Sequence, residues 1–209
     1  MIKVCIADNH PVVHFGIKSY LKDHPKITIA GSLDNFAAAT ELIKSKHIDV
    51  LIIDLDLKGL LSINNIKALI KEQPKTKIII YSSLSEQIYT PNAIRAGVAA
   101  YIHKSAPLDV LEQAILKVAT GEIIFSDDVK KKLAMIAKQN KSERLYRKLS
   151  SREIEVLRYL SDGKKNNEIA KILNLNEKTI STYKLRLLNK LNVTNLVDLV
   201  NKAKTLEIV

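Results

Sequence analysis

The sequence predicts an α/β fold with a five-stranded, doubly wound parallel sheet, followed by a small all-α domain. In residues 1–125, short apolar segments rich in β-branched residues alternate with stretches of helical spacing. Strand then helix, repeated with short connections, is typical of a parallel sheet that helices cover on both faces. From residue 127 onward the alternation stops and apolar residues recur only at helical spacing. The net charge of +11 is uneven too: residues 1–125 carry 14 Lys and Arg against 12 Asp and Glu, and residues 126–209 carry 19 against 10.

Five strands and the helices between them follow from the pattern of apolar residues. Val13, Ile17 and Leu21 share one face of a helix after the first strand. Asp34-Asn35 is a cap for the second helix, and Gln73-Pro74 ends the third. The predicted strands are residues 4–7, 27–30, 50–54, 77–81 and 99–102.

Four polar residues stand at the ends of the predicted strands. Asp8 ends the first strand, Asp54 the third and Ser82 the fourth, and Lys104 follows the fifth. Reactive groups gather beyond the carboxyl ends of such strands, so we expect these side chains to converge. Two adjacent acids repel unless a cation lies between them, and hard oxygen ligands suit Mg²⁺. A magnesium-bound carboxylate can accept a phosphoryl group, whose oxygens Lys104 and Ser82 would bind.

Residues 1–120 resemble the flavodoxin-like receiver domain of bacterial two-component response regulators. The segments that carry the resemblance are IADNHPVV, DVLIIDLDLKG, IIIYSS and GVAAYIHK. The resemblance implies that Asp54 is the phosphoacceptor, that a sensor histidine kinase supplies the phosphoryl group, and that Lys104 binds it. It also implies that Tyr101 turns inward when Ser82 moves onto the phosphoryl group. The implied magnesium ligands are Asp8, Asn9, Asp54 and the backbone carbonyl of Asp56.

The receiver pattern is broken at two positions. Asn9 stands where the family usually has a second acid, and Lys58 stands where it usually has the proline before Gly59. The Asn9 amide oxygen still offers a ligand, directly or through a water. The substitution nevertheless removes one negative charge, so we expect a weakened magnesium site.

The second part of the chain contains a helix-turn-helix. Ile154, Leu157 and Leu160 face inward in its first helix, which Gly163 follows. Two short helices joined by a three-residue turn come next, and the second helix of such a pair fits the major groove of double-stranded DNA. The predicted helices are residues 150–163, 166–173 and 177–191, with the turn at 174–176 and a final helix at 195–205.

The helix at 177–191 presents a cationic and polar face. Phosphates and base edges require such groups, and the basic balance of residues 126–209 favours a polyanionic partner. Residues 149–193 resemble the LuxR-type DNA-binding domain through REIEVL, NNEIA and KTIS…KL, and the domain pair resembles the NarL/FixJ architecture. A histidine frequent in this recognition helix is Tyr183 here. The predicted DNA-binding residues are Lys178, Thr179, Ser181, Thr182, Lys184, Leu185 and Arg186.

These segments set the expected organisation of the protein. We expect a receiver domain over 1–121, a linker over 122–147 with a helix at 127–139, and a DNA-binding domain over 148–209. One helix-turn-helix covers only a half-site, so a homodimer is expected on DNA. No apolar run is long enough to cross a membrane and no signal peptide is evident, which favours a cytoplasmic protein. The single cysteine, Cys5, is expected to be a buried thiol.

Two alternatives stay open from the sequence. The receiver could be a phosphorylation-independent dimerisation and interaction module, for which Asn9 is the sole support. The segment IIDLDLKG also resembles the nucleophile motif of haloacid-dehalogenase-type phosphatases, with residues 122–128 as a later acidic motif. Against this reading, Lys58 stands where those enzymes have Thr or Val, and the motif lies on the third strand rather than the first. We therefore expect a regulator and not an enzyme.

Overall fold

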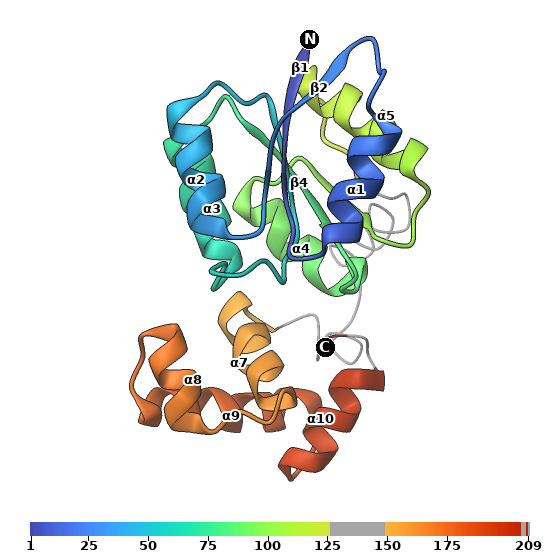
Figure 1. Cartoon of the computed structure of the whole chain (residues 1–209). Helices are drawn as coiled ribbons and strands as arrows, with labels where there is room; N and C mark the ends of the chain where they lie inside the picture. The colour runs from blue at the N-terminus through green and yellow to red at the C-terminus, as the bar shows by residue number, and fades with distance from the viewer. Residues whose placement is uncertain (126–148, 206–207, 209) are drawn as a thin grey trace.

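The computed structural model describes residues 1–125, 149–205 and 208. Within them, a parallel sheet and its helices form an N-terminal domain, and further helices form a C-terminal domain (Figure 1). The helix predicted at 127–139 lies outside the described residues, as does most of the predicted linker. In the described parts of the chain, no helix has the length and apolar character needed to span a membrane.

The sheet has the order β2-β1-β3-β4-β5, and every neighbouring pair of strands is parallel. This order confirms the predicted doubly wound α/β class. Alternate residues face opposite sides of the sheet: Leu51 and Ile53 belong to one buried cluster, and Val50 and Ile52 to the other. The strands are β1 (Ile2–Ala7), β2 (Ile27–Leu33), β3 (Val50–Ile53), β4 (Lys77–Ser82) and β5 (Ala100–His103).

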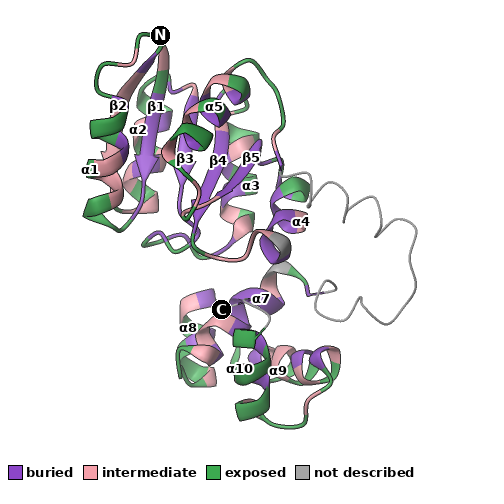
Figure 2. Ribbon diagram, turned by 90° about the vertical axis from the view of Figure 1, so that its right-hand side faces the viewer, coloured by how far each residue is buried: buried purple, intermediate pink, exposed green. Residues whose placement is uncertain are grey.

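Helices cover both faces of the sheet, so β3 and most of β1, β4 and β5 are buried, whereas the edge strand β2 is mostly half-buried (Figure 2). Ile17 of α1 and Ile115 of α5 pack into one cluster, whereas α2, α3 and α4 pack into the other. Asn35 caps α2 as predicted, because its Oδ1 accepts the Ala38 N–H at 2.8 Å. The helices are α1 (Pro11–Tyr20), α2 (Phe36–Ser45), α3 (Ile63–Glu72), α4 (Glu86–Ala96) and α5 (Leu108–Ala119).

The C-terminal domain contains the predicted helix-turn-helix. A capping box begins α7, with Ser150 and Glu153 each accepting the other's backbone N–H. Asn174 ends α8 in the left-handed conformation at φ 52°, and Asn176 begins α9 by accepting the Thr179 N–H at 2.8 Å. The helices are α7 (Ser151–Ser161), α8 (Asn166–Leu173), α9 (Glu177–Leu191) and α10 (Leu196–Thr205).

The two domains touch through α7 and the C-terminal end of the chain. Arg158 on α7 forms an ion pair with Asp56, in the loop after β3, and its Nη1 lies 3.5 Å from the Leu55 carbonyl oxygen. The Tyr89 hydroxyl of α4 donates to the Ile208 carbonyl at 2.9 Å. In the C-terminal domain, α7 faces the sheet domain, and α9 lies on the side of α7 away from the sheet domain (Figure 1).

The thiol of Cys5 provides a test of the N-terminal core. The residue is fully buried in β1, and burial raises the pKa of its thiol to about 12. Because the thiolate is the reactive form, we expect the native protein to resist a chromogenic thiol reagent at about pH 8. The same chain unfolded in urea should react promptly. Rapid stoichiometric labelling of the native protein would contradict a closed core around β1.

Candidate functional site

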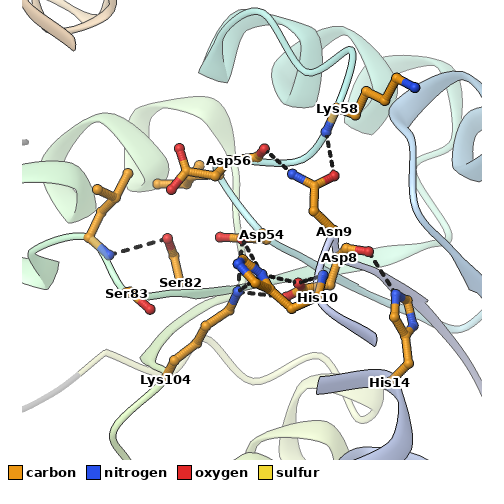
Figure 3. Close-up of polar contacts among 12 residues, drawn as sticks. Asp8, Asn9, His10, His14, Asp54, Asp56, Lys58, Ser82, Ser83 and Lys104 are labelled. Carbon is orange, nitrogen blue, oxygen red and sulfur yellow. Dashed lines mark hydrogen bonds and ion pairs between the residues drawn. The ribbon is translucent and has the colours of Figure 1, made fainter. Parts of the chain in front are cut away.

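Two predicted carboxylates lie side by side at the carboxyl edge of the sheet (Figure 3). β1 and β3 are direct neighbours, with Ala7 paired to Ile53, so the next residues, Asp8 and Asp54, come at the same level. Both side chains are buried, at 2% exposure each. The expected convergence of strand ends is therefore present for this pair.

Lys104 lies between the two acids. Its backbone N–H donates to the Ser82 carbonyl just past β5, and this places the side chain over the same edge. The Nζ atom lies 2.7 Å from Asp8 Oδ2 and 2.8 Å from Asp54 Oδ2. Burial disfavours the ammonium, but its hydrogen bonds to Asp54 and Asp8 and their negative charges outweigh this effect and raise the pKa of Lys104.

Two histidines, which were not predicted as site residues, contact Asp8. The backbone N–H of His10 donates to Asp8 Oδ1 at 2.8 Å, and the ring Nδ1 lies at the same distance from that oxygen. His14 Nε2 lies 2.7 Å from the Asp8 carbonyl oxygen, and its Nδ1 lies 2.5 Å from the Ser32 hydroxyl. The sequence signal for these contacts was the position of the two histidines, two and six residues after Asp8 near the start of α1.

The Asn9 carboxamide contacts the loop after β3 through both of its ends. Its Nδ2 donates to the Asp56 carbonyl at 2.5 Å, and its Oδ1 accepts the Lys58 N–H at 2.9 Å. Figure 3 shows these contacts on the side of the two carboxylates away from Lys104. The amide oxygen predicted to serve the metal thus has a protein partner, and so does the Asp56 carbonyl.

Ser82 and Tyr101 meet at the start of the loop after β4. The Ser82 hydroxyl is buried and accepts the Leu84 N–H at 3.3 Å, while the Tyr101 hydroxyl donates to the Leu84 carbonyl at 2.9 Å. The Tyr101 ring is 1% exposed, and burial is the main cause that raises the pKa of its hydroxyl. Both side chains therefore engage the same stretch of backbone, and the ring already points inward.

The donor set suits a hard cation. Ligand atoms of Asp8, His10 and Asp54 lie within 4.8 Å of one another. Asp54 Oδ1 is buried and has no hydrogen-bond partner among the described residues, which leaves one carboxylate oxygen for an added ligand. Carboxylate oxygens are typical magnesium ligands, so the two carboxylates fit the ion that the sequence predicts.

In the C-terminal domain, α9 is held by one face and presents the other. Ile180, Leu187 and Leu191 are buried against the neighbouring helices. The Lys190 ammonium lies 2.7 Å from the Glu153 carboxylate of α7. Burial opposes the Glu153 charge, but the bonds from Lys190 and Ser150 outweigh it and lower the pKa of Glu153. These contacts fix which face of α9 points outward.

The outward face of α9 consists of the predicted DNA-binding residues. Thr179 and Lys184 are half-buried, and the rest are exposed: Lys178, Ser181, Thr182, Leu185 and Arg186. The Arg186 guanidinium lies 5.8 Å from the centre of the Tyr183 ring, within the range of a cation–π contact. The two residues are three apart on the helix, so the sequence carried a signal for this contact, although the contact was not predicted.

An acid pair with a lysine at parallel strand ends, followed by a helix-turn-helix with a cationic face, defines a two-domain regulatory protein. Residues 4–116 match the response regulator receiver domain family, and residues 147–203 match the bacterial regulatory proteins of the luxR family. The chain belongs to the response regulators, with a receiver domain and a LuxR-type DNA-binding domain. The predicted family is confirmed, and these matches place the chain among regulators and not among phosphatases.

Several known proteins resemble nearly the whole chain. The fimbriae Z protein of Salmonella typhimurium is 32% identical over 205 residues, which cover 98% of this chain and 97% of that protein. The response regulator UvrY of Escherichia coli strain K12 is 28% identical, with 97% and 94% covered. A structure of the Salmonella typhimurium response regulator RcsB has a TM-score of 0.81 at 27% identity, with 99% and 98% covered. Another RcsB structure, bound to the promoter rprA in the presence of the phosphomimetic BeF₃⁻, has a TM-score of 0.79 at 28% identity, with 97% and 98% covered.

Lys104 should stabilise the metal-free protein by compensating two buried acids. We expect Lys104→Met to lower the free energy of unfolding by about 3–5 kcal/mol, because it leaves buried carboxylates unpaired. Since the pKa of Lys104 is raised on folding, its contribution is complete at neutral pH and is lost only as the pH rises through that raised pKa. The deficit should therefore stay constant from about pH 7 to pH 9 in urea titrations.

The matched control is Lys117→Met, which removes an exposed lysine of α5. It should unfold like the unaltered protein. Equal stability of the Lys104 and Lys117 variants would mean that the acids are not paired with Lys104 in solution.

Proposed function

We propose that this protein is a transcription regulator whose binding to double-stranded DNA is controlled by phosphorylation of Asp54. The observation that carries the proposal is the buried Asp8–Asp54–Lys104 cluster on the same chain as an exposed cationic recognition helix. In two-component systems the phosphoryl donor is a sensor histidine kinase, and we propose that class of partner here. We propose that the protein acts in the cytoplasm, where it can reach both the DNA and the kinase.

The side chains of the pocket suit phosphoryl transfer to a carboxylate. An oxygen of Asp54 would attack the phosphorus of a phosphohistidine, forming a new phosphorus–oxygen bond while the phosphorus–nitrogen bond breaks. Lys104, already within 2.8 Å of Asp54, would bind the incoming phosphoryl oxygens, and the Ser82 hydroxyl would turn toward them. Tyr101 is already buried beside that loop, so its ring would keep its inward position when Ser82 moves.

We propose magnesium as the cofactor of this site. The Asp8 and Asp54 carboxylates would hold it together with the Asp56 carbonyl. When bound, the ion supplies positive charge that offsets the carboxylates and the phosphoryl oxygens. His10 would keep Asp8 oriented through the bond from its backbone N–H.

The working units that we propose are the receiver over 1–121, the linker over 122–147 and the DNA-binding domain over 148–209. The active form proposed is a homodimer on DNA, because one recognition helix reads only a half-site. The solved structures of RcsB support this proposal, since one of them describes two RcsB dimers bound to two parallel DNAs.

A second candidate function is a regulator that does not respond to phosphorylation. Its support is that side chains of the protein already neutralise the site. Lys104 compensates both acids, and Asn9 contributes no charge. In that case the receiver would serve only as a dimerisation and interaction module.

Phosphorylation of the full chain separates these candidates. Incubation with a small acyl phosphate and magnesium should add one phosphoryl group, read by intact mass, and Asp54→Asn should abolish the gain. The control Asp23→Asn, which removes an exposed acid after α1, should behave like the unaltered protein. A phosphoryl group on the Asp54→Asn protein would exclude Asp54 as acceptor, and no gain in any protein would favour the phosphorylation-independent regulator.

The recognition helix makes a separate prediction. Lys184→Ala or Arg186→Ala should weaken binding to duplexes of every sequence and lower the salt slope by about one per lost phosphate contact. Substitution of Ser181 or Thr182 should instead change sequence preference, because we propose that these groups contact base edges. Binding isotherms at several salt concentrations, on specific and unrelated duplexes, measure both effects. If neither class of variant alters binding, α9 is not the recognition helix.

A further inference from the structure

We propose that Asn9 and the backbone N–H of Lys58 form one structural unit that holds the loop after β3 (residues 54–62) against β1 without a bound cation. In this role Asn9 is a positioning residue, because it acts on Asp54 through the loop and does not touch the phosphoryl group. The inference rests on the magnesium site proposed above. It assigns Asn9 a task other than that of a weak metal ligand.

The contacts of Asn9 require an amide. Its Nδ2 donates to the Asp56 carbonyl and its Oδ1 accepts from the Lys58 N–H, at 2.5 and 2.9 Å. An amide both donates and accepts, whereas an ionised aspartate only accepts. An aspartate at this position would set a carboxylate oxygen against the Asp56 carbonyl oxygen, which is unfavourable unless a cation lies between them.

The second departure from the receiver pattern completes the unit. A proline at position 58 has no N–H, so it could not donate to Asn9 Oδ1. Lys58 supplies that N–H through its backbone, whatever its side chain does. The two unusual positions, 49 apart in the sequence, thus meet in one hydrogen bond, which requires an acceptor at position 9 and a residue other than proline at position 58.

The loop that Asn9 holds also contacts other parts of the chain. The Lys58 carbonyl accepts the Phe36 N–H at 2.8 Å, and Asp56 forms the ion pair with Arg158 of α7. Asp56 therefore presents its carbonyl to Asn9 and its carboxylate to the DNA-binding domain. The loop position set by Asn9 is the position against which α7 rests.

A cation that binds the Asp56 carbonyl oxygen would share it with the Asn9 N–H, whose partial positive charge opposes the cation. Lys104 already provides positive charge between the carboxylates, and the Asn9 amide already donates to that carbonyl. We therefore expect the loop to be ordered in metal-free protein, and we expect Asn9 to lower the affinity for magnesium instead of supporting it.

Hydrogen exchange of the full chain without divalent cations tests the first expectation. The Lys58 N–H should be protected, and Asn9→Ala should speed its exchange about tenfold or more, because opening no longer breaks that hydrogen bond. The control Asn64→Ala, which removes an exposed carboxamide from α3, should leave it unchanged. Unchanged exchange at Lys58 in the Asn9→Ala protein overturns the proposal.

A double-mutant cycle tests the pairing of the two positions. Lys58→Pro removes the N–H, whereas Lys58→Ala keeps it and serves as the matched control. We expect Asn9→Ala and Lys58→Pro to lower the urea midpoint, and the double variant to fall no further than the lower single variant. The proposal is overturned if the losses in urea midpoint are additive, or if Lys58→Ala loses as much as Lys58→Pro. Either result would show that the Asn9 side chain and the Lys58 N–H do not stabilise the loop together.

A magnesium titration by calorimetry tests the competition. Asn9→Ala should bind magnesium at least as tightly as the unaltered protein, and Asn9→Asp about fivefold more tightly, since it adds a charge and removes the competing donor. Weaker binding by Asn9→Ala would identify Asn9 as a ligand and overturn the proposal. If no variant binds magnesium, the proposed metal site fails, and the exchange experiment still decides whether Asn9 holds the loop.

Discussion

The ammonium of Lys104 between two buried carboxylates is the interaction on which the receiver site depends. Asp8 and Asp54 are 2% exposed, and a pair of acids in such surroundings is costly unless positive charge compensates them. The parallel register of β1 and β3 brings the acids together, and the end of β5 brings the lysine. The topology of the sheet therefore brings the two buried negative charges and the positive charge that compensates them to the same edge. One Asp54 oxygen still has no hydrogen-bond partner among the described residues.

The arrangement of the sheet was readable from the sequence because parallel strands end at one edge. Once alternating strands and helices are recognised, Asp8, Asp54, Ser82 and Lys104 must lie near one another. One helix start followed from local chemistry as well: the predicted cap Asn35 accepts the Ala38 N–H at the start of α2. Local sequence was sufficient in these cases because each signal acts within a few residues.

Other parts of the site depend on contacts that no local pattern encodes. The bond between Asn9 and the Lys58 N–H joins residues 49 apart, and the ion pair of Arg158 with Asp56 joins residues 102 apart. Viewed alone, Asn9 indicated only a weakened metal site, and Lys58 indicated no change in the site. Their geometry became visible when the loop after β3 was seen against the end of β1 (Figure 3). The bond of His10 to Asp8 was not predicted, because it depends on how the backbone turns between β1 and α1.

The hydrogen bond from Tyr89 to the Ile208 carbonyl has a practical consequence for work with this protein. Ile208 is fully buried, whereas Met1 is 80% exposed at the other end of the sheet domain (Figure 1). An affinity tag fused to the C-terminal end would begin next to α4 and the junction of the two domains. A tag fused to the N-terminal end would begin in solvent, far from both the acid pocket and α9. Experiments that compare DNA binding with receiver chemistry are therefore best served by an N-terminal fusion.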